Sequence, residues 1–160
     1  MPIHAVVDRL ERIPGALART IAGTSSAVLA TRPGPGSWSP TEIVCHLRDV
    51  EEPPILAFGA TVDDLATWKI GAPIGHPLDP DRWAVERQYV RNDPHEALAA
   101  LRRRRREVVT LLSALTPAEW QRGGIHPSHG RRTLLDWVGR LAAHDDNHLD
   151  QLRRAVEGRA

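Results

Sequence analysis

Residues 133–157 read TLLDWVGRLAAHDDNHLDQLRRAVE, and this stretch has the periodicity of one long amphipathic helix. Thr133 followed by Asp136 is typical of a helix start, where a hydroxyl caps the amides of the first turn. An apolar face follows at three- and four-residue spacing, made of Leu134, Trp137, Val138 and Leu141. For about one turn the same face carries His144, Asp145 and His148, and it then returns to Leu152. The sequence therefore predicts a long helix whose inward face has a polar interruption.

Three other segments begin with a capping side chain, then Pro, then Glu two residues later. They are Ser39-Pro40-Thr41-Glu42, Asp93-Pro94-His95-Glu96 and Thr116-Pro117-Ala118-Glu119. They predict a helix from Ser39 through Val50, before Pro53-Pro54, a second over about 94–115 and a short helical turn after Thr116. Apolar residues at helical spacing predict a further helix over about 4–30.

The connections predict the arrangement of these helices. Residues 71–81 contain five Gly or Pro residues and are expected to form a loop that crosses between distant ends of a bundle. Residues 123–130 are expected to form a second loop. Because no segment alternates as a strand does, we expect an all-α fold, a four-helix bundle with a long crossover connection.

Composition limits the class of protein. A chain of 160 residues suits a single domain over residues 1–160, and its formal net charge of +1 argues against nucleic acid or an anionic membrane as partner. The lone Cys45 excludes an internal disulfide and fits a reducing compartment. Because no apolar run approaches the roughly 20 residues that span a bilayer, we expect a soluble, cytoplasmic protein.

Three histidines predict a metal site. His144 and His148 are four residues apart and differ by about 40° in direction on a helix, so both can bind one ion. His46 interrupts the inward stripe of its own helix in the same way. Polar side chains that interrupt an apolar face and point into the core lower stability, unless they hydrogen-bond to one another or bind a common ligand. We therefore predict that His46, His144 and His148 hold one divalent ion with an open position. The metalloprotease pattern, with Glu directly after the first histidine, is absent.

Arg105 and Asp145 are the candidate catalytic residues. Arg105 occupies a heptad position that is otherwise apolar, so its guanidinium needs a carboxylate such as Glu51 or Asp145, or a substrate carboxylate in the metal pocket. Asp145 could orient an imidazole, accept a proton from water or pair with Arg105. Gln151 is either a partner of a metal-binding histidine or a solvent-facing residue. His126 and His129, in the expected loop, are either extra ligands or without a role at the site.

Taken together, these segments resemble the DinB-like superfamily. The resemblance runs through Trp38-Ser39-Pro40-x-Glu42-Ile43, His46-Leu47, Arg105, Trp120, His126-Pro127-x-x-Gly130-x-x-Thr133-Leu134 and His144-Asp145-x-x-His148-Leu149-x-Gln151-Leu152. It implies a four-helix bundle with a long crossover, commonly a homodimer, and a zinc or nickel ion on the three histidines. Some members are thiol-dependent S-transferases or isomerases that use bacillithiol, mycothiol or glutathione.

Function is expected to follow from the metal. The preferred hypothesis is a divalent-metal-dependent enzyme acting on a small molecule, in which the ion activates a low-molecular-weight thiol for S-transfer. Hydrolysis by metal-activated water would use the same residues. The alternative from another class is a metal- or ligand-binding stress-response protein without turnover.

Overall fold

The computed structural model of the chain describes residues 2–51, 79–126 and 130–160, and this part is mainly helical. In chain order its elements are α1 (Ile3–Ile21), α2 (Ser26–Ala30), α3 (Pro40–Val50), α5 (Pro80–Glu86), η1 (Tyr89–Arg91), α6 (Pro94–Ala114), α7 (Pro117–Trp120), β1 (Gly123–His126), β2 (Gly130–Thr133) and α8 (Leu134–Val156). None of the described helices combines the length and the apolar character that crossing a membrane requires.

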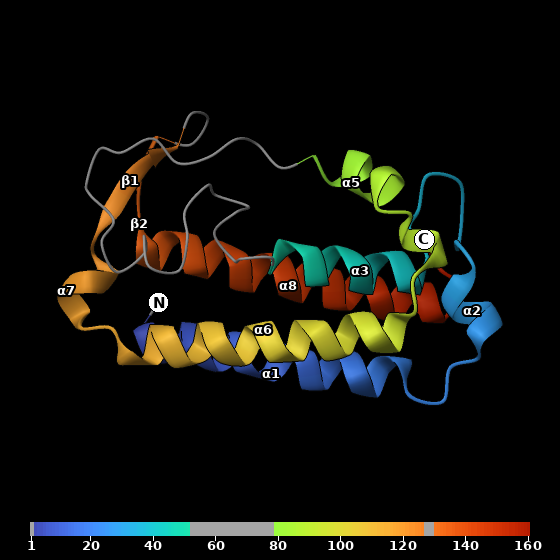
Figure 1. Cartoon of the computed structure of the whole chain (residues 1–160), viewed down its shortest axis with the longest axis horizontal. Helices are drawn as coiled ribbons and strands as arrows, with labels where there is room; N and C mark the ends of the chain where they lie inside the picture. The colour runs from blue at the N-terminus through green and yellow to red at the C-terminus, as the bar shows by residue number, and fades with distance from the viewer. Residues whose placement is uncertain (1, 52–78, 127–129) are drawn as a thin grey trace.

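The long helices α1, α3, α6 and α8 form a four-helix bundle (Figure 1). Helix α1 packs against α6 and α8, and α3 packs against the same two helices from the other side. In Figure 1, α1 and α8 run from left to right, whereas α3 and α6 both run from right to left. Helices α3 and α6 are therefore parallel, as a bundle with a long crossover connection requires. Residues 71–78 of the expected crossover loop lie outside the described residues.

The capping signals predicted the helix starts correctly. Ser39, Thr116 and Thr133 each accept a hydrogen bond from the third helical residue, and Glu42, Glu119 and Asp136 complete capping boxes. Asp93 caps α6 through the amides of His95 and Glu96. These contacts satisfy amide groups that have no partner within the helix.

Three predictions about elements were wrong. The loop expected over 71–81 overlaps helix α5, which begins at Pro80 after the Asp79 cap. The helix expected over 4–30 ends at Ile21, because Gly23 takes a positive φ of 73° and Ser25 caps a separate α2. The loop expected over 123–130 begins with β1, which pairs antiparallel with β2 so that Gly123 lies opposite Thr133. A Cβ at Gly123 would collide with the carbonyl oxygen of Arg132, so this close pairing needs glycine.

The apolar core consists of two clusters separated along the helices. On α8, the last residue of the first cluster is Ala142, and the first residue of the second cluster is Leu149. On α6, Val108 belongs to the first cluster and Leu101 to the second. The polar residues Arg105 and Asp145 lie in these intervals and are buried, with 2% and 1% of their surface exposed. A polar layer thus divides the interior of the bundle.

Arg105 connects the four main helices through this layer. From α6, its Nη1 donates to the carbonyl oxygen of Leu10 on α1 at 2.8 Å. Its Nη2 donates to Glu51, which ends α3, at 2.6 Å and to Asp145 on α8 at 2.8 Å. Burial raises the pKa of Glu51 although Arg105 opposes this shift. The guanidinium therefore compensates two carboxylates that the core would otherwise leave buried without a counter-charge.

A further buried carboxylate, that of Asp49, attaches the segment of α5 and η1 to α3. Asp49 accepts hydrogen bonds from the hydroxyl of Tyr89 at 2.8 Å and from Arg48 at 2.6 Å, and Arg87 lies 2.8 Å away. Burial pushes the pKa of Asp49 upward, but these donors outweigh it and hold the pKa below its usual value. The segment that carries α5 and η1 is thereby fixed beside α3.

We predict that replacing Arg105 by Ala lowers the free energy of unfolding by about 3–5 kcal/mol, because Glu51 and Asp145 lose their buried counter-charge. Arg106, exposed in the same arginine run, is the matched control, and its change to Ala should alter stability by less than about 0.5 kcal/mol. Urea unfolding monitored by circular dichroism measures both. Equal stabilities of the two variants would contradict the role given to Arg105.

Candidate metal centre

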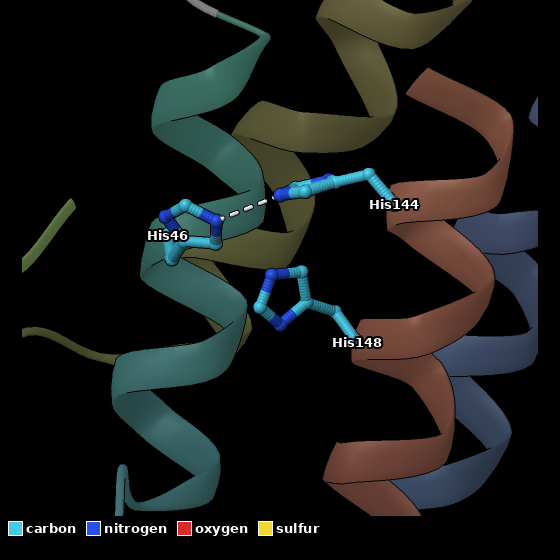
Figure 2. Close-up of side chains that lie close together, drawn as sticks. All are labelled: His46, His144 and His148. Carbon is cyan, nitrogen blue, oxygen red and sulfur yellow. Dashed lines mark hydrogen bonds between the residues drawn. The ribbon is translucent and has the colours of Figure 1, made fainter. Parts of the chain in front are cut away.

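Three imidazoles from two helices converge beside the polar layer (Figure 2). His46 comes from α3, and His144 and His148 come from consecutive turns of α8. One ring nitrogen from each residue lies within 4.8 Å of the corresponding nitrogens of the other two. The closest pair is Nε2 of His46 and Nε2 of His144, at 3.0 Å. The structure thus brings together the three residues that the sequence singled out.

Burial keeps two of these rings neutral. His46 is 3% exposed, whereas His144 and His148 are half-buried. Desolvation, followed by the neighbouring histidines, lowers the pKa of His46 to about 3, and the same causes lower the pKa of His148 to about 4. Near neutral pH these two imidazoles are therefore uncharged and have a lone pair available for a cation.

The donor set fits a divalent ion. Nitrogen ligands about 2.0–2.1 Å from a tetrahedral ion lie about 3.3 Å from one another, a value inside the range that the three histidines span here. The Nδ1 atom of His46 is buried and has no hydrogen-bond partner in the described part of the chain. The Nε2 atoms of His46 and His144, only 3.0 Å apart, lie close enough together for both rings to bind one ion.

Side chains around the site hold the imidazoles in place. Nδ1 of His148 lies 2.7 Å from Oε1 of Gln151, so of the two alternatives for Gln151 the structure shows the contact with His148. Nδ1 of His144 lies 3.5 Å from Oδ1 of Asp145. The Trp38 indole stacks on His148 with an interplanar angle of 10° and contacts His46, with ring centroids 4.9 Å apart. No role at the site was predicted for Trp38, although it lies directly before the Ser39 cap.

Trp38 also borders a groove of about 640 Å³. Its walls include Val85 and Val90, which are 77% and 56% exposed, and the ion pair between Arg32 and Glu42. The groove thus provides an apolar surface next to the ring that packs on two of the histidines.

The two candidate catalytic residues, Asp145 and Arg105, contact one another next to His144. Asp145 faces His144 with one oxygen and Arg105 with the other, and Arg105 is bound to three protein oxygens. The pairing of Arg105 with Glu51 and Asp145, one of the alternatives that the sequence left open, is confirmed. A direct contact of Arg105 with substrate stays a prediction.

The structure describes the side chain of Cys45 but not those of His126 and His129. Cys45 is a buried core residue, and burial raises the pKa of its thiol to about 11. His126 ends β1, but its side chain, like the whole of His129, lies outside the described part of the chain.

Comparison with known proteins identifies the family and relatives of the chain. The model of the DinB superfamily matches residues 9–152. YfiT of Bacillus subtilis, named as a candidate metal-dependent hydrolase, is 25% identical over 144 residues, which cover 89% of this chain and 78% of YfiT. OB0782 of Oceanobacillus iheyensis, with the same description, is 24% identical over 92% of this chain and 81% of its own length.

Two solved structures share the fold. The YfiT structure, described as a four-helix bundle of unusual topology, matches with a TM-score of 0.83 and 22% identity, over 97% of this chain and 86% of YfiT. TT2238, described as a four-helix bundle protein, matches with a TM-score of 0.65 and 22% identity, over 95% of this chain and 98% of its own. Since the family model spans nearly the whole sequence and the bundle agrees with both structures, the chain belongs to the DinB superfamily.

Proposed function

We propose that this protein is a divalent-metal-dependent hydrolase of a small molecule, with zinc or nickel bound by His46, His144 and His148. The observation that carries the proposal is the convergence of three imidazole nitrogens within 4.8 Å at the edge of a buried polar layer. The names of YfiT and OB0782 support the same class of reaction.

The ligand set suits hydrolysis for an electrostatic reason. A divalent ion, when bound, acts as a Lewis acid that lowers the pKa of water and polarises a carbonyl or phosphoryl oxygen. Three neutral imidazoles do not cancel the charge of such an ion, as thiolates or carboxylates would. The partial exposure of His144, whose side chain is 33% accessible, leaves this side of the centre open to water and substrate. The groove beside Trp38, which has both apolar and charged walls, offers room for the part of the substrate that does not react.

Thiol-dependent transfer, the preferred hypothesis from sequence, stays a prediction of the family resemblance. The cluster would suit a thiol ligand as well as water, but YfiT and OB0782 are named for hydrolysis. The expected homodimer likewise stays a prediction.

We predict that protein purified without a metal-affinity tag binds one divalent ion per chain. Changing His46, His144 or His148 to Ala should weaken binding at least about 100-fold, because each removes one of three protein ligands. His95, exposed at the start of α6, is the matched control, and its change to Ala should leave binding unchanged. Elemental analysis and competition titration with a chromophoric chelator measure content and affinity. Wild-type affinity in all three ligand variants would rule out this site.

We predict that the metal-loaded protein hydrolyses members of a panel of activated esters, amides and phosphoesters without added thiol. In this reaction water oxygen bonds to the electrophilic carbon or phosphorus, the leaving-group bond breaks, and the leaving group takes up a proton. Chelation and the His148→Ala change should each remove turnover, and His95→Ala should not. Turnover that requires a low-molecular-weight thiol would instead establish the transferase, and no metal-dependent turnover with either panel would favour a binding protein.

A further inference from the structure

The two histidines on α8 each face a side-chain oxygen from the same helix. Gln151 lies three residues after His148, so both side chains share one face, and Oε1 of Gln151 is 2.7 Å from Nδ1 of His148. Oδ1 of Asp145 is 3.5 Å from Nδ1 of His144. His46 differs, because its buried Nδ1 has no hydrogen-bond partner within residues 2–51, 79–126 and 130–160.

These oxygens decide which ring nitrogen carries the proton. An amide or carboxylate oxygen only accepts, so the nitrogen that faces it must donate. A neutral imidazole has one N–H, and a donating Nδ1 leaves the lone pair on Nε2. In this structure Nε2 of His144 lies 3.0 Å from Nε2 of His46. If Nε2 of His144 accepts in that contact, Nε2 of His46 must donate.

We propose that Gln151 and Asp145 are positioning residues that hold His148 and His144 with Nε2 ready to bind the ion, whereas His46 must shift its proton from Nε2 to Nδ1. This inference rests on the proposed metal site. Gln151 has the larger effect, because its contact is 0.8 Å shorter than that of Asp145.

Arg105 gives Asp145 a fixed orientation. Oδ2 of Asp145 accepts from Nη2 of Arg105 at 2.8 Å, and the carboxylate is 1% exposed. The other oxygen is therefore directed at His144 and cannot turn to solvent. In the Asp145→Asn variant the remaining side-chain oxygen would stay on Arg105, and the amide NH₂ would face His144 and oppose a protonated Nδ1. This change thus reverses the preference while keeping a hydrogen bond to Arg105.

The first experiment uses metal-free protein labelled with ¹⁵N at histidine. We expect NMR to show the Nδ1–H tautomer for His148 and His144 and the Nε2–H tautomer for His46. In the Gln151→Leu variant, His148 should lose this preference, and in Asp145→Asn His144 should lose it. Unchanged tautomers in both variants would overturn the proposal.

The second experiment measures zinc affinity by competition titration. Gln151→Leu should weaken binding about 10- to 100-fold, the usual effect of removing a partner of a metal-binding histidine. Gln151→Glu keeps an acceptor and should stay near the wild type, and Asp145→Asn should weaken binding less than Gln151→Leu does.

Matched controls lie beside each position. Asn147 is an exposed amide next to His148, and Asp146 pairs with Arg9, so Asn147→Leu and Asp146→Asn should leave zinc affinity unchanged. Equal affinities for Gln151→Leu and Asn147→Leu, or an equal loss in Gln151→Glu and Gln151→Leu, would overturn the proposal. If the ligand variants bind zinc as the wild type does, the metal site itself fails, and the tautomers of the metal-free protein still decide the roles of Gln151 and Asp145.

Discussion

The guanidinium of Arg105 is bonded to an oxygen from each of the other three main helices, and the arrangement of the bundle around it depends on those contacts. An arginine at an apolar heptad position would strongly destabilise the folded state if it had no partner in the core. With Glu51 and Asp145 as partners it becomes the centre of a polar layer between two apolar clusters. Because a guanidinium has five donors in a fixed plane, it also restricts how α1, α3 and α8 can shift relative to α6.

The proposed metal centre uses one residue of this layer. Asp145 faces Arg105 with one oxygen and His144 with the other, so the orientation of a proposed ligand depends on a contact within the core. His148 has its own partner in Gln151, and the face of Trp38 stacks on its ring. Local contacts along α8 therefore position two of the imidazoles, whereas the packing of α3 against α8 positions the third.

Sequence predicted best what local chemistry determines. Capping boxes involve residues three apart, so the starts of α3, α7 and α8 could be located directly. The break after Ile21 was missed because apolar spacing continues through it. The β1–β2 pairing was missed, although its partners are close in sequence, because these short strands have no alternating apolar pattern. Helix α5 was missed although Asp79-Pro80 repeats the cap-and-proline signal found at Asp93. For Arg105 the heptad showed burial, but only the packed helices could show which oxygens it meets.

Because Asp145 contacts both Arg105 and His144, it couples the histidine cluster to the packing of the helices. A divalent ion on the three imidazoles would bring two positive charges close to the polar layer, which holds the carboxylates of Glu51 and Asp145 together with Arg105. Burial raises the pKa of Glu51, because a carboxylate away from water is costly to keep ionised. A cation beside Asp145 relieves part of that cost, since opposite charges attract strongly where water is excluded. The same carboxylate that joins α8 to α6 therefore favours both the folded bundle and a positive ion at its histidines.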